Sequence, residues 1–126
     1  MDIVSKFAVI IILFLATLGF GLWVSFSGKP YNGLLFTAHK LFALVMVVFI
    51  VIRMIQVLRG VQPQMLLVSL LALAGLCVIV LFATGALLSI GTQRYSLSLT
   101  THRVAMILLP LAMGGSLYLL VQASLT

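Results

Sequence analysis

The chain has 126 residues, of which 64% are hydrophobic and only 6% are charged, and its formal net charge is +6. Because a soluble domain carries about 25% charged residues, this composition excludes an ordinary soluble protein and indicates one that lies in a membrane. The single acidic residue, Asp2, excludes catalysis by paired carboxylates and a carboxylate-rich calcium or magnesium site. The seven basic residues form no run or dense patch, so we expect no nucleic acid as a partner.

Four apolar runs follow one another along the chain, at about residues 3–26, 34–58, 65–90 and 99–124. Each is long enough to cross a hydrocarbon core of about 30 Å as a helix, which takes about 20 residues. The connections are short and rich in turn residues: SGKPYNG, RGVQPQ and GTQRYS. Because short loops make successive helices antiparallel, we predict an all-α fold, a transmembrane up-down-up-down four-helix bundle that forms a single domain over residues 1–126.

In the first two runs, glycines lie before the connecting loop and a histidine lies after it. Gly19 and Gly21 lie near the end of the first run, and His39, followed by Lys40, lies about five residues inside the second. The last two runs repeat this arrangement with Gly85 in the third run and His102, followed by Arg103, in the fourth.

The two histidines are the only ones in the chain, and they are 63 residues apart. The same offset matches several other positions: Gly28 with Gly91, Leu34 with Leu97, Thr37 with Thr100, and Lys40 with Arg103. This pattern suggests a duplicated helical hairpin, whose copies would be related by an axis along the membrane normal.

The repeat predicts that both histidines lie at the same membrane face, because the second and fourth helices run in the same direction. Each is expected roughly 5–8 Å below the start of its helix at 1.5 Å per residue. Two imidazoles at equal depth can bind a flat metal cofactor between them, and haem fits because its iron takes one imidazole nitrogen on each side. Zinc fits poorly, because it needs three or four protein ligands and the chain offers these histidines and the lone Cys77. A carbonyl or threonine oxygen is expected to accept the other ring N–H.

Three further groups of residues would serve the haem. Cations at the histidine face would hold its anionic propionates: Lys29, Lys40, Arg94 and Arg103. Residues without a Cβ would admit the edges of its ring: Gly19, Gly21 and Gly85. Residues three or four positions from a histidine would flank the ring: Phe36, Ala43, Leu99 and Met106. Simpler interpretations stay open, because Lys40 and Arg103 can extend to lipid headgroups and glycines can let helices pack closely.

His39-Lys40 on the second helix and His102-Arg103 on the fourth, both near one face, resemble the small four-helix membrane cytochromes of b type. The resemblance implies haem held between a histidine pair and electron transfer, often to or from quinone or a partner redox subunit. Many members of that family carry a second histidine pair at the opposite face, whereas this chain has a single pair. We therefore expect one haem b near one face, with His39 and His102 as iron ligands. Both axial positions are then filled, which favours an electron carrier over a catalyst.

Other functions stay open at the level of sequence. The histidines would also suit paired polar residues or a proton path, and the chain would suit a non-redox small membrane subunit, an interaction protein, or a haem carrier or sensor. We expect an integral protein in contact with lipid, in a bacterial or archaeal cytoplasmic membrane. Both termini are expected in the cytoplasm, because the basic residues not assigned to haem slightly favour that side. A homo-oligomer is compatible with the sequence.

Overall fold

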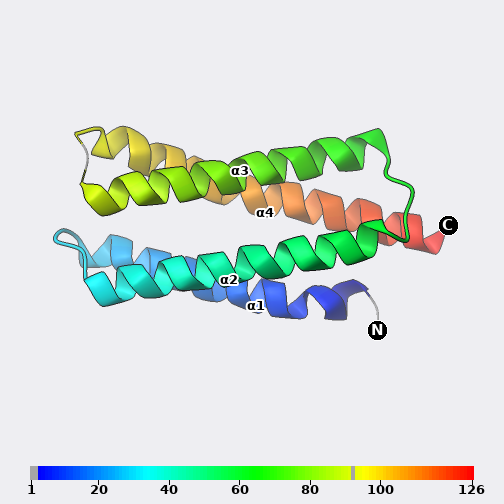
Figure 1. Cartoon of the computed structure of the whole chain (residues 1–126), viewed down its shortest axis with the longest axis horizontal. Helices are drawn as coiled ribbons and strands as arrows, with labels where there is room; N and C mark the ends of the chain where they lie inside the picture. Colours follow the sequence, from blue (N-terminus) through cyan, green and yellow to red (C-terminus); the bar gives the residue numbers. More distant parts are fainter. Residues whose placement is uncertain (1–2, 92) are drawn as a thin grey trace. The chain divides into compact units, whose positions relative to one another are not determined.

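The computed structural model describes residues 3–91 and 93–126, and these residues form four α-helices (Figure 1). The helices are α1 (Ile3–Ser27), α2 (Gly33–Leu58), α3 (Met65–Ile90) and α4 (Tyr95–Leu125). The described part of the chain contains no strand, so the predicted all-α fold with four helices is confirmed. All four helices are long and apolar enough to cross a membrane, as in an integral membrane protein.

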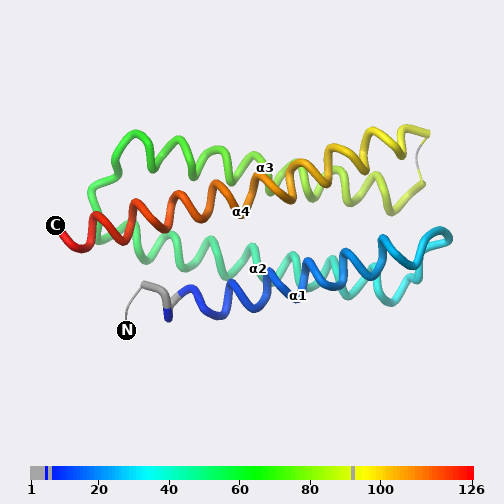
Figure 2. The backbone as a smooth tube through the Cα atoms, turned by 180° about the vertical axis from the view of Figure 1, so that it is seen from behind, coloured from blue at the N-terminus to red at the C-terminus, as the bar shows by residue number. Residues whose placement is uncertain are grey.

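The chain divides into two compact units, Met1–Gly60 and Val61–Thr126. Each unit is a hairpin of two antiparallel helices, α1 with α2 in the first and α3 with α4 in the second (Figure 2). The single domain predicted over residues 1–126 stays a prediction.

A glycine in the left-handed conformation follows the first helix of each hairpin. Gly28 follows α1 with φ of 68°, and Gly91 follows α3 with φ of 67°. Glycine adopts this left-handed conformation without the steric cost of a Cβ, which is why it commonly ends helices. The two glycines are matched at the repeat offset, so their shared backbone conformation supports the duplicated hairpin. Asn32 then caps α2, because its side chain accepts hydrogen bonds from the N–H groups of Leu34 and Leu35.

Helix α4 begins at Tyr95, four residues before the predicted start of the fourth run. The Ser98 N–H donates a hydrogen bond to the Arg94 carbonyl at 3.0 Å, so the helix already forms before the apolar run. The prediction began the helix at the first apolar residues, although the polar residues before them are also helical. His39 is six residues beyond the start of α2 and His102 is seven beyond the start of α4. At 1.5 Å per residue these positions are about 9 and 10.5 Å along their helices, deeper than predicted.

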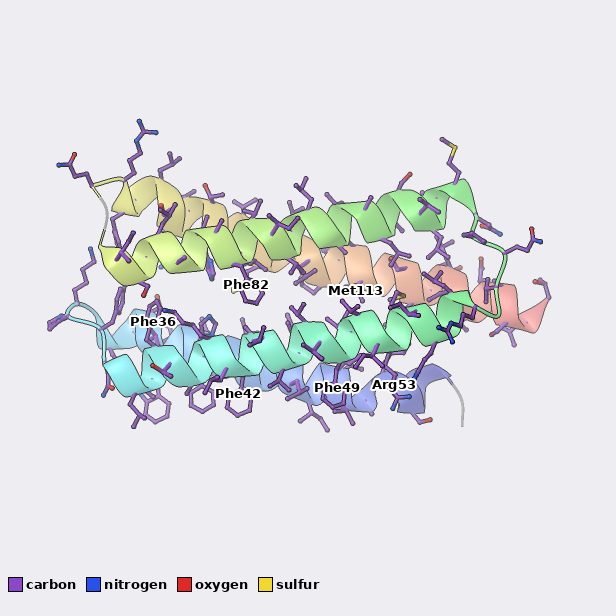
Figure 3. All side chains as sticks on the ribbon, in the orientation of Figure 1. Phe36, Phe42, Phe49, Arg53, Phe82 and Met113 are labelled. Atoms are coloured by element: carbon purple, nitrogen blue, oxygen red, sulfur yellow. The ribbon has the colours of Figure 1, made fainter. Side chains whose placement is uncertain are left out.

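Small and aromatic side chains hold the two helices of each hairpin together. In the first hairpin, the rings of Phe20 and Phe42 stack with centroids 5.1 Å apart, and Figure 3 labels Phe42 on α2. In the second, a buried cluster joins α3 to α4 through Ala74, Cys77, Leu109 and Ala112. Small side chains let membrane helices approach closely, which replaces the hydrophobic drive that water supplies to soluble proteins.

Candidate functional site

His39 is half-buried on α2 and bonds across the first hairpin to the backbone of α1. Its Nδ1 lies 2.9 Å from the carbonyl oxygen of Thr17. A carbonyl only accepts hydrogen bonds, so Nδ1–H is the donor. In the neutral ring the proton is therefore on Nδ1, and the lone pair that can ligate a metal is on Nε2.

The absence of a side chain at Gly21 lets this ring lie close to α1. A Cβ at Gly21 would lie 2.9 Å from Cε1 of His39 and 3.2 Å from its Nδ1. Real Cβ contacts are not that short, so any larger residue would displace the imidazole or the helix. Gly19, two residues away and on the other side of α1, has no atom within 4 Å of its Cβ position. Of the two glycines predicted on α1, only Gly21 contacts the histidine.

His102 is half-buried on α4 and bonds to a side chain of α3. Its Nδ1 lies 2.9 Å from Oγ1 of Thr84, and that oxygen lies 2.7 Å from the carbonyl oxygen of Val80. The same oxygen lies 3.3 Å from the carbonyl oxygen of Leu81. A hydroxyl that donates its one proton to either carbonyl accepts the bond from His102 Nδ1–H. With the proton assigned in this way, the neutral ring of His102 has the same tautomer as that of His39, with its lone pair on Nε2.

These two oxygen partners fit the expectation of a carbonyl or threonine acceptor, but the sequence did not identify them. Thr17 precedes His39 by 22 residues, and Thr84 precedes His102 by 18. Thr84 was detectable in principle, because it is the polar residue of the third run that is next to Gly85. The residue whose carbonyl would accept His39 Nδ1–H had no comparable signal, since every residue has a carbonyl.

The remaining predicted residues are divided between the same two hairpins as the histidines. A Cβ at Gly85 would lie 3.7 Å from Cε1 of His102, an ordinary contact. Lys40 is exposed, and its Nζ lies 4.7 Å from the ring centroid of Phe36, which in turn packs against Tyr31. The four residues expected to flank a haem are all half-buried: Phe36, Ala43, Leu99 and Met106. The other three cations are all exposed: Lys29, Arg94 and Arg103.

Metal chemistry at these positions is limited to one imidazole in each hairpin. His39 belongs to the first unit and His102 to the second. Among the residues that the structure describes, no three His, Cys, Asp or Glu side chains come together as a zinc site would need.

Comparisons with models of known protein families, with curated proteins and with solved structures find no match to this chain. Each histidine places Nδ1 2.9 Å from an oxygen of the preceding helix, a backbone carbonyl for His39 and a hydroxyl for His102.

Proposed function

We propose that the protein is a b-type membrane cytochrome that binds one haem b with His39 and His102 as its axial ligands. The supporting observation is that Nδ1 of each ring lies 2.9 Å from an oxygen of the preceding helix, and both oxygens can accept Nδ1–H. Metal-ligating histidines are commonly oriented in this way, because a bond at one ring nitrogen fixes the tautomer and aims the other nitrogen at the metal. A ring used only to satisfy a polar group in the membrane has no need of the same tautomer in both hairpins.

When bound, haem supplies one-electron chemistry at its iron. The protein's own residues would hold and tune it. The four cations Lys29, Lys40, Arg94 and Arg103 would bond to the propionates, and their positive charge would favour the reduced iron. The residues Phe36, Ala43, Leu99 and Met106 would contact the ring faces. Gly19 and Gly21 would not admit its edges as predicted, because Gly19 faces away from His39 and the His39 ring itself fills the space beside Gly21, which leaves Gly85 for that role.

With both axial positions filled, the protein would carry electrons rather than catalyse a reaction at iron. Its partners would be quinone or a redox subunit, with membrane lipid around the apolar helices. Assembly into a homo-oligomer is compatible with this role. Haem transport or sensing would use the same ligands, but one axial bond would then have to break when the haem or a signal molecule is exchanged.

An absorption spectrum tests this proposal directly. The protein purified from cells supplied with haem is expected to show a b-type reduced spectrum with one haem per chain. His39→Ala and His102→Ala should each abolish or sharply change that spectrum, because each removes one of two ligands. Gly75→Ala is the control, since no atom lies within 4 Å of its Cβ position on α3.

Two results would overturn the proposal. A colourless preparation would favour a non-redox membrane subunit. A normal spectrum in either histidine variant would show that the missing imidazole is not a ligand.

A further inference from the structure

The two hairpins hold their histidines at equivalent carbonyls, although the bonds look different. The repeat offset of 63 residues matches Thr17 with Val80 and Gly21 with Thr84. The Thr17 carbonyl accepts the bond from His39 directly, and the Val80 carbonyl accepts the bond from the Thr84 hydroxyl. The shorter of the two hydroxyl bonds, 2.7 Å to Val80 against 3.3 Å to Leu81, therefore leads from His102 to the same position of the repeat that accepts the bond from His39.

The residue four positions after the carbonyl residue, Thr17 or Val80, decides whether the histidine bonds to the carbonyl directly or through a hydroxyl. In the first hairpin this residue is Gly21, and the His39 ring occupies the space that a side chain would fill, 2.9 Å from the Cβ position. In the second it is Thr84, whose side chain is 7% exposed and fills the corresponding space. The hydroxyl lies between the His102 ring and the carbonyl, with bonds of 2.9 Å to the ring and 2.7 Å to the carbonyl.

We propose that Thr84 is the positioning residue of His102: its hydroxyl passes the ring's hydrogen bond on to the Val80 carbonyl and so fixes the lone pair on Nε2. Gly21 has the corresponding role for His39 by leaving the carbonyl of Thr17 accessible. The idea that this arrangement presents Nε2 to haem iron rests on the proposed function. The arrangement itself is a property of the chain without haem.

A threonine in a membrane helix often bonds back to a carbonyl four residues earlier for its own sake. Such a purely structural role predicts that an isosteric valine is the mildest replacement and that glycine, a poor helix former, is the worst. A positioning role predicts the reverse order for the histidine. Valine fills the space without a hydroxyl, whereas glycine opens the path to the carbonyl, as at position 21.

The experiment uses the full chain in detergent micelles, prepared without haem and labelled with ¹⁵N in its histidine rings. Nitrogen chemical shifts report which ring nitrogen carries the proton, and hemin titration then reports affinity. Thr84→Ser should keep the Nδ1–H tautomer of His102, and Thr84→Gly should largely keep it. Thr84→Val should lose it and lower hemin affinity about 10- to 100-fold, as expected when the hydrogen-bond partner of a metal ligand is removed.

A second pair of variants asks the same question in the first hairpin. Gly21→Thr and Gly21→Val add equal bulk beside His39, but only threonine can rebuild the bridge. We expect the tautomer of His39 to survive better in the threonine variant. Ser69→Ala is the control, because Ser69 on α3 also bonds back to a carbonyl, that of Met65 at 2.9 Å, and is exposed. Circular dichroism checks that each variant is helical, and Thr84→Ala replaces Thr84→Val if the latter does not fold.

The outcomes separate this inference from the proposed function. If Thr84→Val keeps the tautomer and the hemin affinity, or if Thr84→Gly is at least as damaging, the positioning role is wrong even though haem binds. If Thr84→Val changes the tautomer but the unmodified chain binds no hemin, the positioning role stands and the cytochrome proposal fails.

Discussion

At the scale of single residues, the chain controls two ring protons by two different means. A backbone carbonyl accepts the bond from His39, and a helix holds that carbonyl rigidly. A hydroxyl accepts the bond from His102, and a hydroxyl hydrogen can rotate about the Cβ–Oγ1 bond. The close contact of His39 with Gly21 adds to this difference, because the corresponding contact of His102 with Gly85 is 3.7 Å. His39 is the more tightly restrained imidazole.

Substitution of Gly21 by alanine tests this restraint. A Cβ 2.9 Å from Cε1 of His39 would push the ring away and break its bond to Thr17. We expect a loss of about 1–3 kcal/mol in the free energy of unfolding, the usual range for overpacking. Thermal unfolding followed by circular dichroism measures it.

Gly75→Ala is the matched control, since its new methyl group meets no atom and alanine favours a helix. It should leave stability unchanged or raise it. Equal stabilities of the Gly21→Ala and Gly75→Ala variants would contradict the close packing of His39 on α1.

At the scale of elements, α3 and α4 pack against each other through small residues, and large apolar residues of α3 are exposed. The α3–α4 contact is built on Ala74, Cys77 and Ala112, each at most 5% exposed. Large side chains such as Leu66, Leu73 and Ile79 on α3 are exposed. In water this surface would aggregate, whereas in a bilayer it meets hydrocarbon chains.

A larger residue at the centre of this contact should separate the helices. Ala74→Leu adds bulk where α3 meets α4, and we expect it to cost about 1–3 kcal/mol of unfolding free energy. Ala72→Leu places the same side chain at an exposed position of the same helix, where lipid accommodates it. Unfolding in sodium dodecyl sulfate measures both, and equal midpoints would show that α3 and α4 do not pack through Ala74.

At the scale of the whole molecule, the described residues form four helices long and apolar enough to cross a membrane, and four crossings would bring residues 3 and 126 to the same side. We propose that this side is the cytoplasm of a bacterial or archaeal cell. Lys6, Arg53 and Arg59 would then be the cytoplasmic cations. The histidine loops would be on the outside, where their cations would be committed to haem propionates.

A reporter at the C-terminus tests this orientation. Green fluorescent protein fused after Thr126 should fluoresce, because it folds in the cytoplasm, and alkaline phosphatase at the same place should be inactive. Fusions within the loop at Asn32 should give the opposite pair of results. Active phosphatase at the C-terminus would reverse the orientation and bring the histidine face to the cytoplasm.

Much of the fold is already determined by the sequence, because span length and hydrophobicity are local properties. Three of the four helices begin and end within one residue of the apolar runs, and the start of α4 differs because Tyr95, Ser96 and Ser98 are polar yet helical. The glycine turns were visible too, since only glycine takes a left-handed conformation freely, as at Gly28 and Gly91. The sequence also indicated the histidines, because the chain has only two and each has a threonine two residues before it and a basic residue directly after it.

Only the tertiary structure decided which atoms those histidines meet. The helices are apolar almost all round, so no polar face in the sequence indicates the side on which α1 faces α2. The sequence therefore could not choose between Gly19 and Gly21, which point to opposite sides of one helix. It also could not identify the Thr17 carbonyl or the Thr84 hydroxyl, because these partners depend on how far one helix slides along the next. That register is set by the packing of small and aromatic side chains across each hairpin.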